Sequence, residues 1–321
     1  MANLITVEHL SRYYGKHCAV NDVTFTLAQG EILGFLGPNG AGKTTTMQML
    51  CGNLAPSSGQ IKINGFDLQD QPKLAKRSLG YLPDTPPLYK DLSVQEFLHY
   101  CAQLHGVAKN SIAGAINNVQ ERCGLTGVSH RLIANLSKGY QQRVGIAQAI
   151  LHNPDVIILD EPTVGLDPLQ IREIGALIRE LGQDHGVILS THRLSEVQES
   201  CTHVQIINQG QLILKESIED LNLRMNTGSL QITTRLPPDT AVLLAIPGVS
   251  AIETLTGNQI IIRHSMTDDP TRRIAETIIA AGWEFLQLPT IFAAGWELQE
   301  LAPVKKSMED IFIALTRSND L

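Results

Sequence analysis

Cysteines and long apolar runs are both scarce in this sequence, and each shortage excludes a class of protein. The five cysteines are widely spaced and form no C-x-x-C pair, so neither a disulfide framework nor a zinc site is indicated. The longest apolar stretch, residues 241–249, is interrupted by Pro247 and Gly248 and has about half the length of a membrane span. Because the first residues also lack the apolar segment of a signal peptide, we expect a cytoplasmic protein that is neither exported nor membrane-spanning.

Basic residues are also fewer than acidic ones. Lys and Arg number 25 against 32 Asp and Glu, which gives a formal net charge of -7 and a pI of about 5.8. Such a balance provides no general basic field for nucleic acid, so we expect no nucleic-acid partner. The 321 residues are 43% hydrophobic and 18% charged, which is enough apolar material for a folded chain. The length favours one large domain with a smaller one, or two comparable domains.

The order of apolar patterns predicts an α/β fold. Short apolar runs at 31–36, 156–159 and 187–190 alternate with helical patterns, which is typical of a largely parallel sheet. The first thirty residues instead alternate apolar and polar side chains, which predicts an N-terminal antiparallel β layer. Between about 92 and 148 the apolar residues recur at helical spacing, so we expect a helical subdomain inserted between strands.

A break in these patterns at 222–229 divides the chain into a domain at 1–221 and a small α+β domain at 222–321. For the second domain the patterns predict strands at 230–234 and 259–263 and helices at 270–281 and 308–315. The segments GWEFLQLP, from Gly282, and GWELQELAP, from Gly295, form a near-repeat that indicates two related strands or a local duplication.

Residues 37–44, GPNGAGKT, match the phosphate-loop pattern G-x-x-x-x-G-K-[ST] between an apolar strand and a helix. Glycines allow consecutive backbone N–H groups to surround phosphate oxygens, and the following helix directs its positive end at the anion. We expect Lys43 to reach the β- and γ-phosphates of a nucleotide and Thr44 to ligate Mg²⁺. The predicted nucleotide-binding residues of this segment are Gly37, Asn39, Gly40, Ala41, Gly42, Lys43, Thr44 and Thr45.

Two acids follow the apolar run at 156–159. An arrangement of this kind places one carboxylate near Mg²⁺ and the next near an attacking water. Asp160 is therefore a predicted metal ligand and Glu161 a predicted catalytic residue. Acids at strand ends also serve as solvent-facing or capping groups, which is the alternative for both.

Together with LSKGYQQR at 136–143, these motifs resemble the ATP-binding cassette (ABC) ATPases, and the resemblance covers about residues 3–220. It implies a P-loop NTPase core of the ABC type. The octapeptide is similar to the family's signature motif, in which Ser137 and Gly139 would contact a nucleotide held by a partner subunit; Lys138 and Tyr140 replace the consensus Gly and Gln. An ordinary helix N-cap is the alternative for Ser137. One cassette per chain implies a homodimer, or a pair with a second cassette, around two ATP molecules.

The resemblance extends to three further positions. Asp167 lies in a segment similar to the loop that connects the two nucleotide sites, and His192 looks like the switch histidine that contacts the γ-phosphate. Tyr14 is placed like the family's aromatic platform for adenine, with Tyr13 as a competing candidate and an ordinary strand tyrosine as the alternative. The catalytic set that the resemblance implies is Lys43, Glu161 and His192.

Asp84 departs from the family pattern. It ends LGYLPD, where the family usually has a Gln whose amide oxygen contacts Mg²⁺. A carboxylate still offers oxygen to a hard cation, and it adds negative charge near the γ-phosphate. Asp84 is thus a third predicted metal ligand beside Thr44 and Asp160, with a solvated loop aspartate as the alternative.

By resemblance, the chain is an ATPase subunit of a bacterial exporter of the multidrug, polysaccharide or gliding-motility type, whose cassettes carry a similar accessory C-terminal domain. Its integral-membrane permease would be a separate protein, and the chain would lie peripherally on the cytoplasmic face of the membrane. One alternative is a soluble ABC ATPase that serves translation, DNA repair or cofactor assembly, although the two-cassette chains and long coiled coils typical of such proteins are not found here. Another makes residues 222–321 a regulatory module.

Overall fold

The computed structural model describes residues 3–233, 239–254, 259–264, 270–280 and 301–305. Contacts divide the chain into two units, Met1–Ile218 and Glu219–Leu321. The division falls at the start of α8 (Ile218–Met225), whereas the sequence pattern puts the boundary after Leu221. Among the helices within these described ranges, none combines the length and apolar character needed to cross a membrane.

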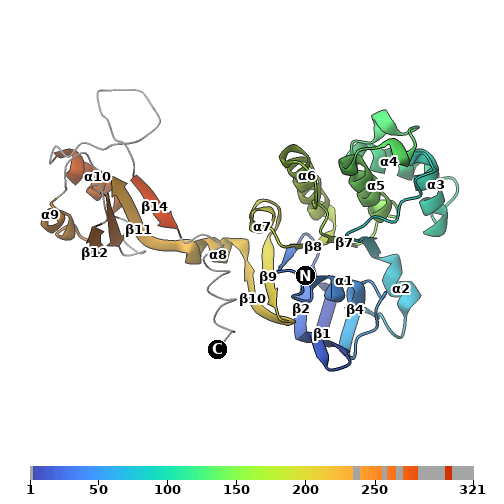
Figure 1. The fold of residues 1–321 in the computed structure, drawn as a ribbon, viewed down its shortest axis with the longest axis horizontal. Helices are drawn as coiled ribbons and strands as arrows, with labels where there is room; N and C mark the ends of the chain where they lie inside the picture. Colours follow the sequence, from blue (N-terminus) through green and yellow to red (C-terminus); the bar gives the residue numbers. More distant parts are fainter. Residues whose placement is uncertain (1–2, 234–238, 255–258, 265–269, 281–300, 306–321) are drawn as a thin grey trace. The chain divides into compact units, whose positions relative to one another are not determined.

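The larger unit is built around a six-stranded sheet with the strand order β10-β9-β3-β8-β7-β6. Figure 1 labels β10, β9, β8 and β7 of this sheet. Its strands are β3 (Ile32–Leu36), β6 (Leu79–Leu82), β7 (Val156–Asp160), β8 (Gly186–Thr191), β9 (His203–Asn208) and β10 (Gln211–Ser217). All neighbours are parallel except the pair β9 and β10. Because parallel strands end at the same edge, the segments after β3, β6, β7 and β8 meet there. The predicted parallel sheet is confirmed.

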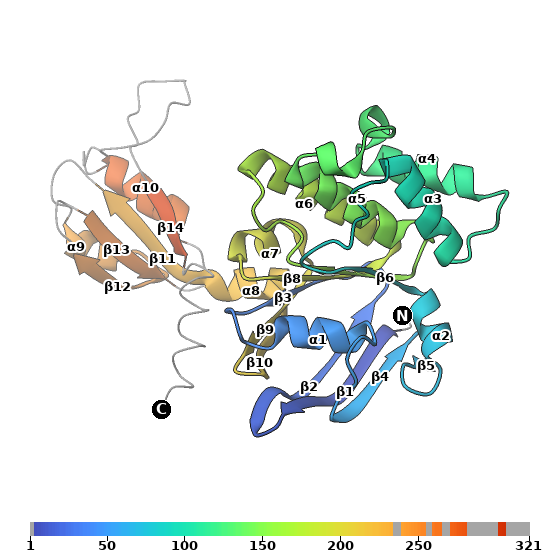
Figure 2. The same cartoon turned by 45° about the vertical axis from the view of Figure 1, so that its right-hand side comes forward.

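A second, antiparallel layer has the order β2-β1-β4-β5 and confirms the predicted N-terminal layer. Its strands are β1 (Asn3–Tyr14), β2 (His17–Ala28), β4 (Ser58–Ile63) and β5 (Phe66–Asp67). The helix α1 (Lys43–Leu50) packs between the two sheets (Figure 2), where Met47 and Leu50 share one buried core with Phe25 and Phe35. That core fixes α1, and with it the phosphate loop, against both sheets.

Helices cover the other face of the six-stranded sheet (Figure 2). They are α5 (Lys138–Ile150), α6 (Pro168–Asp184) and α7 (Leu194–Ser200), and α3 (Val94–Leu104) and α4 (Ile112–Arg122) pack on α5. A capping box starts α3, since the Ser93 hydroxyl accepts from the Glu96 N–H and the Glu96 carboxylate accepts from the Ser93 N–H. Residues 92–148, all of which are described, contain no strand, so the predicted helical subdomain is confirmed. The short α2 (Pro72–Arg77) precedes β6.

The second unit is a four-stranded antiparallel sheet with the order β12-β13-β11-β14. Its elements are β11 (Asn226–Thr233), α9 (Thr240–Leu244), β12 (Val249–Thr254), β13 (Gln259–His264), α10 (Thr271–Ala280) and β14 (Leu301–Lys305). Leu230, Ile232, Ile260 and Ile262 of the sheet form a separate core with Leu243, Ile246, Ile274 and Ile278. The near-repeat, apart from its last residues in β14, and the helix predicted at 308–315 lie outside the described residues.

Candidate functional site

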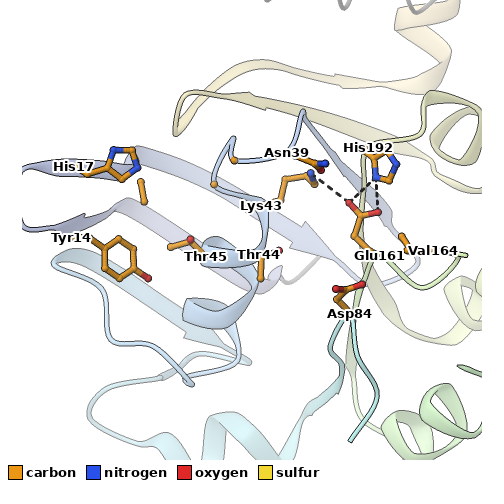
Figure 3. Close-up of a pocket in the computed structure, with 13 residues that line it drawn as sticks. Tyr14, His17, Asn39, Lys43, Thr44, Thr45, Asp84, Glu161, Val164 and His192 are labelled. Carbon is orange, nitrogen blue, oxygen red and sulfur yellow. Dashed lines mark hydrogen bonds and ion pairs between the residues drawn. The ribbon is translucent and has the colours of Figure 1, made fainter. Parts of the chain in front are cut away.

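A pocket of about 510 Å³ opens at the edge of the sheet where β3, β6, β7 and β8 end (Figure 3). This volume lies within the usual range for small-molecule sites. The pocket is lined by Tyr14, His17, Ala19, Asn39, Gly40, Gly42, Lys43, Thr44, Thr45, Asp84, Glu161, Val164 and His192. The structure therefore gathers most of the predicted site residues in one place, although they come from five separate segments of the chain.

Two glycines allow the phosphate loop to pack closely against neighbouring backbone. A Cβ on Gly37 would lie 2.4 Å from the carbonyl oxygen of Ile207, and one on Gly42 would lie 2.5 Å from that of Ala19. Gly42 also has a backbone φ of +106°, a value that residues with a side chain rarely adopt. Gly37 and the 3%-exposed Ala41 do not line the pocket. Their contribution is to shape the loop whose backbone N–H groups can face an anion.

Lys43 begins α1 and is nearly buried, with 6% of its surface exposed. Its Nζ donates to the carbonyl oxygens of Gly37 and Pro38 at 2.8 and 3.3 Å and lies 3.5 Å from Oε1 of Glu161. The ammonium group is thus held at the loop by two neutral acceptors and one carboxylate. Phosphate oxygens would be stronger acceptors for it than the two carbonyls.

Glu161 follows β7 in a left-handed conformation, with φ of 50°, and its N–H donates to the carbonyl of Ser190 at 3.0 Å. Nδ1 of His192 lies 2.9 and 3.1 Å from the two carboxylate oxygens of Glu161 (Figure 3). An ionised carboxylate only accepts hydrogen bonds, so Nδ1 of His192 carries the proton in this pair. The arrangement orients a carboxylate toward the mouth of the phosphate loop.

Asp160 is fully buried behind the pocket and does not line it. Its Oδ1 accepts from the Ser190 hydroxyl at 2.7 Å, whereas its Oδ2 has no hydrogen-bond partner among the described residues. Burial raises the pKa of Asp160, and the nearby charges of Glu161 and Asp84 raise it further. A cation beside Oδ2 would stabilise the negative charge of this buried carboxylate.

These donors fit Mg²⁺. The free oxygen of Asp160, the hydroxyl of Thr44 and the carboxylate of Asp84 are hard oxygen ligands. No group of three or more His, Cys, Asp or Glu side chains in the described part of the chain could hold a metal by itself. Mg²⁺ characteristically needs only one or two carboxylates when substrate phosphates complete its shell.

Ser137, Gly139 and Asp167 lie outside the pocket. Ser137 is the N-cap of α5, where its hydroxyl accepts from the Tyr140 N–H at 3.4 Å. Asp167 caps α6 through two backbone N–H groups, both at 3.0 Å. The capping role that the sequence offered as the alternative for Ser137 is therefore present. Ser137 and Asp167 are exposed, so both remain accessible to a second molecule.

Sequence reasoning missed His17, Ala19 and Val164. His17 lies opposite Tyr14 in the register of the β1–β2 hairpin, and both line the pocket (Figure 3). The short turn at Gly15 and Lys16 contains the signal that could have revealed this pairing.

Comparisons with known proteins identify relatives of similar sequence and fold. The family model described as ABC transporter matches residues 20–164. The uncharacterized ABC transporter ATP-binding protein YxlF of Bacillus subtilis is 38% identical over 72% of this chain and 77% of its own. The bacitracin transport ATP-binding protein BcrA of Bacillus licheniformis is 39% identical over 70% of this chain and 73% of its own. A solved structure of an ATP-binding subunit of an ABC transporter is 33% identical, with a TM-score of 0.63 over 69% of this chain and 92% of its own.

Proposed function

The chain belongs to the ABC transporter ATP-binding family, and from this premise we propose that it is the ATP-hydrolysing subunit of an exporter with a separate membrane permease. Membership confirms the resemblance drawn from the sequence. The observation that carries the catalytic part of the proposal is the meeting of Lys43, Glu161 and His192 in one pocket beside the phosphate loop.

Six side chains of the pocket, the loop N–H groups and the buried Asp160 have a part in this proposal. The loop N–H groups and Lys43 bind the β- and γ-phosphates, while Tyr14, 46% exposed, offers a ring face to the base. Glu161 accepts the proton of the attacking water, and the Nδ1–H of His192 keeps the carboxylate oriented. Mg²⁺, held by Thr44, Asp84 and Asp160, would neutralise charge on the phosphate oxygens.

The partners are proposed on separate grounds. The exposed Ser137 and Asp167 lie away from the pocket of their own chain, which supports a dimer in which each chain completes the site of the other. The relative named for bacitracin transport supports a transport role. A chain that drives a permease would sit on the cytoplasmic face of the membrane, and the second unit would be its accessory domain.

Two experiments test the proposal. The full chain should hydrolyse ATP in the presence of Mg²⁺, and Lys43→Ala should lose ATP binding in calorimetry because a cation on the phosphates is removed. Lys109→Ala, which changes an exposed lysine remote from the pocket lining, should behave as the wild type. Unchanged affinity of the Lys43 variant would refute the phosphate-loop assignment. For the partner, a tagged chain should be recovered from membranes with a multi-span protein, and recovery from the soluble fraction alone would refute the permease.

A further inference from the structure

One buried carboxylate lies next to the proposed site without lining it. Glu196 stands in the first turn of α7, and 5% of its surface is exposed. None of the roles above uses this residue. Burying a carboxylate is unfavourable unless hydrogen bonds and an opposite charge compensate it, so its partners are informative.

The hydroxyl partners of Glu196 come from two segments, the loop after β7 and the end of β8. The Thr163 hydroxyl donates to Oε1 at 2.5 Å, and the Thr191 hydroxyl donates to Oε2 at 2.8 Å. The guanidinium of Arg193 lies 3.2 Å from Oε1. Both threonines are buried, at 3% and 0% exposure. Each carboxylate oxygen therefore has a hydroxyl donor, and these charge-assisted bonds are stronger than bonds between neutral groups.

The two threonines that bind Glu196 lie close in sequence to two residues of the proposed site. Thr163 is two residues after Glu161, and Thr191 directly precedes His192. β7 and β8 pair along their length, and the bond from the Glu161 N–H to the Ser190 carbonyl follows the last pair of that register. Beyond that bond Thr191 pairs with Leu36 of β3 and not with the segment after β7. Glu196 joins that segment to Thr191, in addition to the contact between His192 and Glu161.

Glu161 also needs such support. Its φ of 50° lies in the left-handed region, which is unfavourable for residues other than glycine and persists where the surroundings hold it. The Thr163–Glu196 bond fixes the chain two residues after that position. The Thr191–Glu196 bond fixes the chain directly before the histidine whose Nδ1 contacts Glu161.

We propose that Glu196 is a positioning residue that joins the loop after β7 to the end of β8 and keeps His192 within hydrogen-bond distance of the Glu161 carboxylate. The inference rests on the proposed ATPase function. Since neither Lys43 nor the phosphate loop is bonded to Glu196, the connection acts on the hydrolytic step and leaves ATP binding unchanged.

The test compares substitutions that keep shape and change hydrogen bonding. Thr191→Val removes the hydroxyl that donates to Glu196, whereas Thr191→Ser keeps it; Thr163→Val and Thr163→Ser form a second matched pair. Glu196→Gln leaves only one acceptor oxygen. We expect kcat to fall roughly 10- to 100-fold in the valine and glutamine variants, as misplacement of a catalytic group does. The ATP Kd from calorimetry should stay within about twofold, and the serine variants should retain the wild-type kcat.

A control separates positioning from general loss of stability. Leu181→Ala, in the buried part of α6, should lower Tm and leave kcat unchanged well below that Tm. Valine variants with wild-type kcat, or with kcat and ATP affinity lost together, would overturn the inference. If the wild-type chain neither binds nor hydrolyses ATP, the proposed function itself fails. If the Glu196→Gln variant does not fold, the valine and serine variants of Thr163 and Thr191 test the proposal.

Discussion

Lys43 and Glu161 are paired with each other, with Nζ and Oε1 3.5 Å apart. Both side chains are largely shielded from water, at 6% and 12% exposure, so this attraction is only weakly screened. The proposed function assigns both groups to the same γ-phosphate. ATP must therefore draw Lys43 away from a carboxylate that also repels the phosphate.

Glu161→Gln should act on binding and hydrolysis in opposite directions. The amide cannot take the proton of the attacking water, so we expect the ATPase rate to fall by about 100-fold or more. Loss of the negative charge should also tighten ATP binding, because Lys43 is released and repulsion is removed. Calorimetry and a steady-state ATPase assay measure the two effects.

The same variant should accumulate as an ATP-bound dimer. Size-exclusion chromatography with ATP and Mg²⁺ detects that species, and Glu180→Gln on the exposed face of α6 is the matched control. A Glu161 variant that remains monomeric with ATP bound would argue against a site shared between two chains.

Asp84→Gln tests the departure from the family pattern. Asp84 lines the pocket, and its charge contributes to the raised pKa of the buried Asp160. If the carboxylate is a direct ligand, its replacement by a neutral amide should raise the Mg²⁺ concentration needed for half-maximal hydrolysis. In a metal-free buffer the same change should tighten ATP binding, since a repulsive charge is removed. Superimposable Mg²⁺ and ATP curves for the two proteins would leave Asp84 as a solvated loop residue.

The parts of the site that the sequence could predict depend on local patterns. The phosphate loop is defined by a strict spacing, and β3, β7 and β8 are recognisable because continuous apolar runs mark strands buried on both faces. A parallel sheet then brings their following residues to one edge, which is why Lys43, Glu161 and His192 could be expected together.

The remaining features depend on tertiary placement and have no spacing signal. Glu196 meets Thr163 only because α7 packs beside the loop that follows β7. Asp160 is recognisable as an acid at a strand end, but its complete burial follows from packing on both faces of the sheet. The contacts of Ser137 and Asp167 within one chain are helix caps. Their proposed contacts with a nucleotide of a partner depend on a second chain.

Arg12 provides a test of the base platform. Its guanidinium carbon lies 4.8 Å from the centroid of the Tyr14 ring, and its Nη1 donates to the Ala55 carbonyl at 2.8 Å. Tethered in this way, the cation holds the ring by a cation–π contact. Arg12→Met keeps the length and removes the charge, and we expect about two- to fivefold weaker ATP binding.

Inorganic tripolyphosphate is the internal control for Arg12, because it has no base to stack on Tyr14. Its affinity for the Arg12 variant should equal that for the wild type in calorimetry. Equal losses for ATP and tripolyphosphate would mean that Arg12 acts on the phosphate loop and not through the ring.

The stability of the chain should depend on pH through His152. Its ring stacks on that of His105, with centroids 4.0 Å apart, and its Nε2 lies 3.1 Å from the Leu79 carbonyl oxygen. Burial, with a further contribution from His105, lowers the pKa of His152 to about 4. The unfolded chain, with an ordinary histidine pKa near 6.5, therefore binds more protons between about pH 4 and 6.5 than the folded chain does.

This difference sets the sign of the effect. The contribution of His152 to the free energy of unfolding is fully present above about pH 6.5 and is lost as the pH falls toward 4. The loss is about 1 kcal/mol near pH 5.5. In His152→Gln this group no longer titrates, so the drop in Tm between about pH 7.5 and 5.5 should be smaller than in the wild type. His203→Gln, which changes an exposed histidine, should keep the wild-type drop. Identical pH dependence in the wild type and the His152 variant would show that folding does not lower the pKa of this histidine, and the assignment of acid sensitivity to the stacked pair would be wrong.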